Sequence, residues 1–239
     1  MSQTTPYSNT DNKKKQITKM FDNIAGSYDF LNHTLSLGMD NVWRKIAIKK
    51  LTNNPTTILD IATGTADFAI IASKYTKANI TGIDISQAML DIGNQKITKK
   101  GLSDRVNLQL ADSENLPFDD NSFDALTAGF GVRNFEDLHK GLSEMNRSLK
   151  SGGILAILEP SEPTIFPLKL FHNLYFHYIL PFIGGIISKD KDAYSYLPDS
   201  VSAFPSGKTF LTELEKAGFK ECKHIPLTFG VVSLYIAIK

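Results

Sequence analysis

The chain has 239 residues, and its 26 basic and 25 acidic side chains nearly balance, so the bulk charge favours neither a nucleic acid nor an acidic partner. Cys222 has no second cysteine to pair with, which excludes an intrachain disulfide and fits a reducing compartment. The first 16 residues lack the apolar core of a signal peptide, and the longest apolar run is interrupted by His177 and Pro181 before it could span a membrane. We therefore expect a cytoplasmic protein.

The N-terminal part is expected to begin as a flexible tail over residues 1–16. Its one basic run, Lys13–Lys15, is interpreted as solvated, with weak attraction to an anionic membrane surface as the alternative. Apolar residues at helical spacing then predict short helices over about 13–24 and 39–51.

Strands and helices alternate through the middle of the chain. The predicted strands cover residues 56–61, 79–84, 106–111, 123–128 and 153–158, and the helices between them cover 65–75, 87–100 and 137–149. A further helix over 206–217 precedes two strands, 224–228 and 231–238, whose short connection requires an antiparallel pair. We expect an α/β fold, with a doubly wound, mostly parallel sheet of about seven strands and an antiparallel edge strand.

One domain is expected to cover residues 17–239, with helices over 17–52 at its N-terminal side. Residues 163–205 interrupt the alternation because they are rich in aromatic and aliphatic side chains. Such an insertion is typical of core packing. However, its apolar residues occupy more than one helix face, so an α-helical lid over an apolar ligand is the alternative.

The most informative motif runs from residue 58 to 67 and reads as a strand followed by a glycine turn that opens a helix. Ala66 takes the place of the second glycine in the dinucleotide fingerprint, after Gly64. Asp67 falls in the first helical turn, where a phosphate would otherwise bind, and Asp60 stands on the other side of the turn. Two carboxylates disfavour a pyrophosphate and suit a cofactor that has a positive charge and no phosphate. S-adenosylmethionine is such a cofactor.

Carboxylates also end the next two predicted strands. Asp84, 20 residues after Gly64, is placed for a ribose diol, and Asp112, with Ser113 beside it, for an adenine amino group. Any one of these acids alone is equally well interpreted as a turn or helix cap. Because the carboxyl ends of parallel strands meet at one edge of a sheet, we expect Asp60, Asp84 and Asp112 to lie together.

Blocks along nearly the whole chain resemble one family. They are Met20–Ala25, Tyr28–Asn32, Leu35–Gly38, Trp43–Arg44, Asp60–Thr65, Ala111–Asp124, Gly129–Asn134, Arg147–Gly153, Glu159–Ser161, Leu180–Gly184 and Asp192–Pro198. The chain resembles the ubiquinone/menaquinone biosynthesis C-methyltransferase family, and most of all its demethylmenaquinone branch. It departs from the family pattern at Ala66, usually glycine, at Ser151, often proline, and at Asp40, commonly histidine.

The resemblance implies a Rossmann-like class I methyltransferase that uses S-adenosyl-L-methionine and no metal. By similarity, the cofactor contacts fall on Thr65, Asp84, Asp112 and Ser113, with Gly129 lining the site. From the residues themselves, Asp60 and Gly64 join this set.

The resemblance also implies methyl transfer to a ring carbon of a prenylated hydroquinone, which must be held in line with the methyl group. Arg133 is the candidate to stabilise the phenolate or orient a water, because its guanidinium stays protonated; a surface salt bridge is the alternative for it. Asn134 is expected to hold the second oxygen and Tyr28 to close the site. His172 and His177 are alternative bases.

The expected reaction converts demethylmenaquinol to menaquinol in menaquinone biosynthesis. The alternatives are C-methylation of the benzoquinol of ubiquinone biosynthesis, an NAD-dependent reductase, and a non-catalytic S-adenosylmethionine-binding module. A polyprenyl tail would lie in an apolar groove under residues 163–205, so we expect transient contact with the inner face of the membrane. No nucleic-acid partner is expected, and a homodimer is left open.

Overall fold

A single sheet of seven strands forms the centre of the protein, with strand order β3-β2-β1-β4-β5-β7-β6. This computed structural model describes residues 4–7, 10–163, 165–167, 169–170, 174 and 191–239. The strands are β1 (Thr57–Ile61), β2 (Asn79–Asp84), β3 (Val106–Leu110), β4 (Phe123–Gly129), β5 (Leu149–Pro160), β6 (Lys220–Leu227) and β7 (Val232–Ile238).

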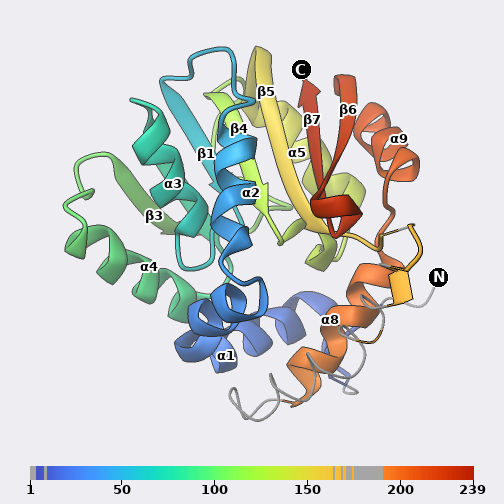
Figure 1. Cartoon of the computed structure of the whole chain (residues 1–239). Helices are drawn as coiled ribbons and strands as arrows, with labels where there is room; N and C mark the ends of the chain where they lie inside the picture. The colour runs from blue at the N-terminus through green and yellow to red at the C-terminus, as the bar shows by residue number, and fades with distance from the viewer. Residues whose placement is uncertain (1–3, 8–9, 164, 168, 171–173, 175–190) are drawn as a thin grey trace.

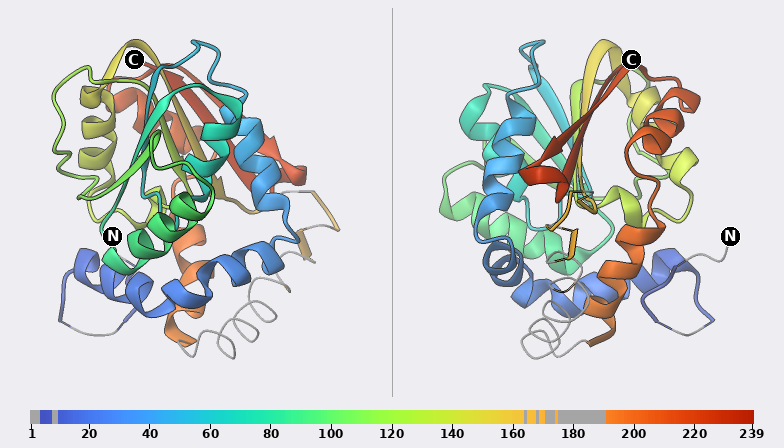
Figure 2. Two further views of the ribbon diagram at one scale, coloured as in Figure 1. Left: turned by 90° about the vertical axis from the view of Figure 1, so that its left-hand side faces the viewer. Right: turned by 45° about the vertical axis from the view of Figure 1, so that its right-hand side comes forward.

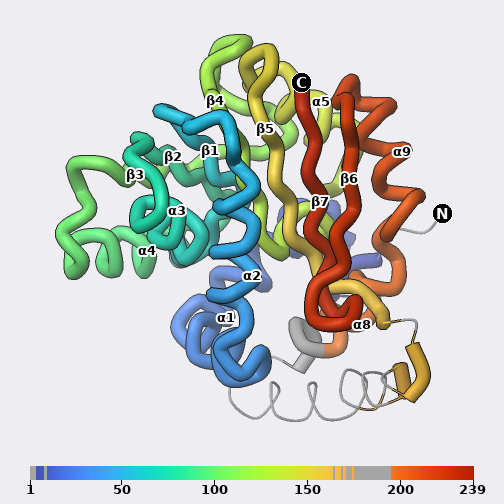
Figure 3. The backbone as a smooth tube through the Cα atoms, turned by 45° about the horizontal axis from the view of Figure 1, so that its top comes forward, coloured from blue at the N-terminus to red at the C-terminus, as the bar shows by residue number. Residues whose placement is uncertain are grey.

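The strands from β3 to β5 pair in parallel, whereas β7 pairs antiparallel to both of its neighbours. β1 pairs in parallel with β2 and β4, and β4 pairs in parallel with β5. β7 runs antiparallel to both β5 and β6, so it lies one position in from the edge strand β6 (Figure 3). The predicted seven-stranded, mostly parallel sheet with an antiparallel edge is confirmed, and the reversed strand is β7, next to the edge strand β6.

Helices cover both faces of the sheet, which confirms the doubly wound prediction (Figures 1 and 2). The α-helices are α1 (Lys13–Leu35), α2 (Met39–Ile48), α3 (Asp67–Tyr75), α4 (Gln87–Lys99), α5 (Leu138–Ser148), α8 (Lys191–Ala203) and α9 (Lys208–Lys216). Two short 3-10 turns, η1 (Val132–Asn134) and η3 (Thr228–Gly230), follow β4 and β6. One core cluster joins α2, α3 and α4 to the sheet, and a second joins α5 and α9 to its other face. The core residues of the central strands are therefore buried from both sides.

The helices α1 and α8 lie across the carboxyl ends of the parallel strands, below the sheet in Figure 1. Helix α1 is longer than expected, because it continues past Gly26 to pack the fully buried Leu31. Residues 13–16, which the sequence analysis assigns to a flexible tail, form its first turn. The Asn12 side chain caps this turn by accepting the backbone N–H of Lys15 at 3.1 Å. The N-terminal segment is therefore part of the wall around the strand ends.

Within the segment 163–205, residues 191–203 form α8, while 171–173 and 175–190 lie outside the described residues together with His172 and His177. Helix α8 packs its buried Tyr196 into the cluster under α1. Among the described residues, no helix combines the length and apolar character needed to cross a bilayer.

Candidate active site

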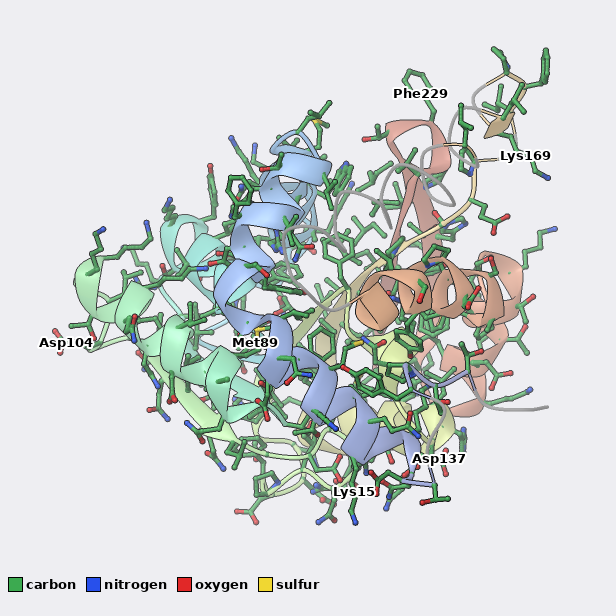
Figure 4. The ribbon with its side chains drawn as sticks, turned by 90° about the horizontal axis from the view of Figure 1, so that it is seen from below. Lys15, Met89, Asp104, Asp137, Lys169 and Phe229 are labelled. Carbon is green, nitrogen blue, oxygen red and sulfur yellow. The ribbon has the colours of Figure 1, made fainter. Side chains whose placement is uncertain are left out.

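Two adjoining cavities lie at the carboxyl ends of the strands, beneath α1. The larger has an empty volume of about 640 Å³ including its mouth, which is within the range of small-molecule sites. Its walls include Lys14, Ile17, Phe21, Asp84, Ile85, Met89, Asp112, Ser113, Phe130 and Asn134. The smaller is lined by Arg44, Asp60, Thr63, Thr65, Asp67 and Phe68. Tyr28, Ala62, Gly64 and Gly129 line both. Figure 4 shows α1 crossing these strand ends with Met89 beside it.

The turn after β1 has an unusual backbone. Ala62, Gly64 and Ala66 all have positive φ, at 52°, 55° and 66°. Glycine adopts this region without cost, whereas an alanine there is strained, so the family preference for glycine at position 66 has a backbone reason. Backbone strain clusters at ligand sites, and two of these residues, Ala62 and Gly64, line both cavities.

Asp84 stands at the end of β2 and lines the larger cavity. Its two oxygens accept the backbone N–H of Gly64 at 2.8 Å and of Ser86 at 2.9 Å. Burial raises the pKa of Asp84, and these N–H donors oppose that shift. The carboxylate therefore joins the turn after β1 to the start of α4, and its remaining lone pairs face a cavity large enough for a nucleoside.

Asp112 and Ser113 follow β3 and line the same cavity. The Asp112 carboxylate accepts Lys14 Nζ at 2.7 Å and the backbone N–H of Glu114 at 2.9 Å. Lys14 also binds Glu114 at 3.0 Å. Asp112 lies at the strand end, as predicted from the sequence. The basic run Lys13–Lys15 was predicted to be solvated, whereas its Lys14 binds Asp112 and closes the cavity there.

Thr65 and Asp60 border the smaller cavity. The Thr65 hydroxyl donates to Asp29 of α1 and accepts Lys96 Nζ at 3.1 Å, so it fastens α1 to the turn. Asp60 is fully buried and accepts the hydroxyls of Thr63 and Thr127 at 2.5 and 2.6 Å. Burial raises the pKa of Asp60 to about 6, although both hydroxyls favour its ionised form.

Two of the three residues proposed for chemistry reach the cavities. Tyr28 contributes to the walls of both, and burial raises the pKa of its hydroxyl, which therefore stays protonated near neutral pH. Asn134 lies in η1 and is 7% exposed. Its Oδ1 accepts the Tyr196 hydroxyl at 3.2 Å, while its buried Nδ2 has no hydrogen-bond partner among the described residues. A buried amide donor without a protein partner is satisfied by the oxygen of a ligand or of a water.

Arg133 lies behind this wall and is not among the described residues that line either cavity. Its Nη1 binds Glu159 at 3.0 Å and the Phe130 carbonyl, and its Nε donates to Ser200 of α8 at 3.3 Å. Glu159, fully buried at the end of β5, also accepts the backbone N–H of Val132 at 2.7 Å. The guanidinium thus holds η1 to β5 and α8.

Three contributors to the site were not predicted from the sequence: Lys14, Arg44 and Tyr196. Arg44 and Tyr196 fall in blocks of family resemblance, which was the available signal. Nothing in their sequence neighbourhood specifies a partner, because each one contacts a residue from another element or lines a cavity that several elements build.

Comparisons with known proteins match this chain over nearly its full length. The model of the ubiE/COQ5 methyltransferase family matches residues 9–239. The chain belongs to this family. A relative named demethylmenaquinone methyltransferase, from Bacteroides fragilis, is 48% identical and the match covers 98% of this chain and 96% of the relative. The ubiquinone/menaquinone biosynthesis C-methyltransferase UbiE of Geotalea daltonii is 46% identical, with 95% and 97% covered.

Solved structures of this methyltransferase fold are more distant in sequence. A SAM-dependent methyltransferase from Aquifex aeolicus superposes with a TM-score of 0.56 at 18% identity and covers 82% of this chain and 88% of its own. Phosphoethanolamine N-methyltransferase 2 of Haemonchus contortus, in complex with S-adenosyl-L-methionine, gives 0.59 at 16% identity, with 88% and 59% covered. These likenesses show the fold alone. Family and fold together make the protein an S-adenosylmethionine-dependent methyltransferase of class I.

The cavity fits this cofactor. Asp84 offers carboxylate oxygens for a ribose diol, and Asp112 with Ser113 offers acceptors for an adenine amino group. Ile85 and Met89 supply apolar wall between these acids for a flat base. The confirmed cofactor and the described lining therefore agree, and the individual contacts remain predictions.

Proposed function

We propose that this methyltransferase transfers a methyl group to a ring carbon of demethylmenaquinol. The high identity over nearly the full length of the Bacteroides fragilis relative supports this substrate. The unpaired Nδ2 of Asn134 in the cavity wall supports a substrate that brings an oxygen acceptor to this point. Benzoquinol methylation is the second candidate, because the Geotalea daltonii relative is named for both quinone pathways.

The chain's own residues provide orientation and charge stabilisation. S-adenosylmethionine, when bound, supplies the electrophilic methyl group. Asn134 Nδ2 would donate to the quinol oxygen and stabilise the negative charge that remains on it when the hydroxyl proton passes to solvent water. Tyr28 stays protonated and would act as a donor or a wall, not as a base. Both residues thereby hold the acceptor ring against the cofactor end of the cavity.

We propose that Arg133 contributes to the reaction by keeping Asn134 in place. It fixes η1 through Glu159 on one side and Ser200 on the other. Without its guanidinium, the fully buried Glu159 carboxylate would lose its cationic partner and the turn that carries Asn134 would lose an anchor. A direct contact with the phenolate, as the sequence suggests, would require the guanidinium to leave these partners.

We further propose that exposed apolar residues beside the site contact a bilayer that contains anionic lipid. Phe166 and Phe229 are 81% and 75% exposed, and Lys169 adds positive charge on the same side of the molecule (Figure 4). Phe229 has φ of 57°, a strained backbone for a bulky residue. Ser161 donates to the carbonyl of Gly230 at 2.8 Å, which brings the two segments together. A quinol with a polyprenyl tail would reach the cavity from such a surface.

The proposal is tested by incubating the full chain with methyl-labelled cofactor and a matched pair of quinols, one with the demethylmenaquinol ring and one with the benzoquinol ring. Label on the ring carbon of the naphthoquinol, at a much higher rate, is expected. Equal or greater transfer to the benzoquinol would assign the second candidate. Cofactor binding without transfer to either ring would reject a quinol as the methyl acceptor.

A further inference from the structure

The two cavities together contain two cationic side chains among their described lining residues, Lys14 and Arg44. Lys14 belongs to the larger cavity, where Asp112 and Glu114 neutralise it at 2.7 and 3.0 Å. Arg44 belongs to the smaller cavity, on the other side of Tyr28. Because Tyr28, Gly64 and Gly129 line both spaces, the two cavities adjoin, with Lys14 in the wall of one and Arg44 in the wall of the other.

Arg44 is held in place from two sides. It lies on α2, is 5% exposed, and its Nη1 forms an i,i+4 ion pair with Asp40. Its guanidinium carbon lies 5.5 Å from the centre of the Phe130 ring. A guanidinium has five N–H donors, and the Asp40 bond is the one hydrogen bond that the described part of the chain provides for it. Oriented donors therefore remain on a cavity wall.

The neighbouring carboxylates do not use up this charge. Asp67 is paired with Lys96 at 2.5 Å, and Asp60 is bound by the hydroxyls of Thr63 and Thr127. Asp40 is thus the one acid in direct contact with Arg44 among the described residues. A buried, positively charged guanidinium with unused donors in a cavity wall favours a ligand carboxylate, which it can bind with two parallel hydrogen bonds.

We propose that Arg44 binds the carboxylate at the methionine end of S-adenosylmethionine. This inference rests on the proposed function, because it takes the larger cavity as the site of the nucleoside. The cofactor carries one anionic group, and it lies at the end of the molecule away from the adenine. With Asp84 and Asp112 at the nucleoside, the cavity that continues past Tyr28 receives the amino-acid end, and Arg44 is the cation in its wall.

The test compares two ligands that differ in the amino-acid tail. S-adenosylhomocysteine carries the carboxylate, whereas 5′-methylthioadenosine has the same nucleoside without it. We expect Arg44→Met to weaken S-adenosylhomocysteine binding by about 10- to 100-fold, the range for a lost charged hydrogen bond, in isothermal titration calorimetry. Binding of 5′-methylthioadenosine should change less than about twofold, because the nucleoside contacts remain. Arg44→Lys should keep part of the preference for the carboxylate ligand.

The matched control is Arg105→Met, because Arg105 binds the carbonyls of Ser73, Thr76 and Ala78 away from the cavities. It should leave both affinities unchanged. Equal weakening of both ligands by Arg44→Met, or no weakening of either, would overturn the inference. If Arg44→Met does not fold, as thermal melts would show, a carboxylate preference in Arg44→Lys equal to that of the wild type decides against it. Failure of the wild type to bind either ligand would reject the nucleoside site itself.

Discussion

At the scale of single residues, the site depends on side chains that serve the fold and the ligand together. Asp84 is the clearest case, because its carboxylate fixes the turn at Gly64 and also lines the larger cavity. Asp112 similarly binds its own loop through the Glu114 N–H while it faces the cavity. Substitutions at such positions must be compared with controls that separate stability from binding.

We predict that Asp84→Asn weakens S-adenosylhomocysteine binding by about 10- to 100-fold, because charge-assisted bonds to the ribose and to Gly64 N–H are lost. Titration calorimetry measures the change. The control is Asp91→Asn on the exposed face of α4, where Asp91 accepts Gln87 Nε2 at 2.8 Å. Unchanged affinity in Asp84→Asn would refute the ribose assignment.

The positions of these acids could be predicted from the sequence, whereas the contacts of Arg133 could not. Asp84 and Asp112 end or follow strands, and parallel strands bring their ends together by rule. Arg133 binds Glu159, 26 positions away, and nothing local indicates that pairing. The sequence therefore shows which residues reach the strand ends, but not which of them face a cavity and which face one another.

At the scale of elements, the cavity wall at Asn134 is built where three elements meet. The turn η1 carries Asn134, α8 supplies the Tyr196 hydroxyl, and β5 supplies Glu159. We assign Tyr196 no chemical step in the reaction. By donating to Oδ1 it fixes the orientation of the Asn134 amide, and we propose it as a positioning residue.

We predict that Tyr196→Phe lowers kcat or raises KM for the quinol by about 3- to 10-fold, the effect of one neutral hydrogen bond, while KM for the cofactor stays unchanged. Steady-state kinetics with each substrate varied in turn measure this split. Tyr235→Phe is the control, because the buried Tyr235 hydroxyl also loses one bond, from Gly207 N–H at 2.8 Å, outside the cavities. Equal kinetic effects in both variants would contradict the positioning role.

The strands were predicted more accurately than α1. The bounds of β2 were predicted without error, because its alternation of buried and polar residues is local. Helix α1 was expected to end near residue 24, because the apolar residues at helical spacing were followed only to Ile24. Contacts of Tyr28, Leu31 and the Asp29 carboxylate with other elements override that local preference, and they are not visible in a window of sequence.

At the scale of the whole molecule, a buried acid ties stability to pH. Burial raises the pKa of Asp60 from 3.8 to about 6, so the folded protein holds a proton that the unfolded chain releases between pH 4 and 6. The ionised carboxylate therefore costs stability above about pH 6, and this cost disappears below about pH 4.

We predict that Asp60→Asn removes this dependence. The free energy of unfolding of the wild type should rise relative to that of Asp60→Asn by ~3 kcal/mol as the pH falls from 7 to 4, since a shift of about two pKa units corresponds to that energy. Urea unfolding of both proteins across this range gives the difference, in which all other titrating groups cancel. A difference that does not vary with pH would show that the Asp60 pKa is ordinary.

We also predict that Phe229→Ser reduces co-sedimentation with vesicles of anionic lipid, by about 3- to 10-fold, because the buried apolar area of one aromatic ring is lost at the bilayer. Tyr75→Ser is the control, because Tyr75 is an exposed aromatic residue at the end of α3. Equal loss of vesicle binding in both variants, or no loss in either, would exclude Phe229 as a membrane contact.

The position of β7 affects the order in which the sheet can be completed. β7 is made after β6, yet it lies between β6 and β5. Until residues 232–238 pair, β6 has no partner strand, and the outer edge of β5 offers unpaired N–H and C=O groups to any other strand. The half of the sheet that carries the site can pair earlier, so the newly made chain is open to wrong association at the opposite side until its last strand arrives.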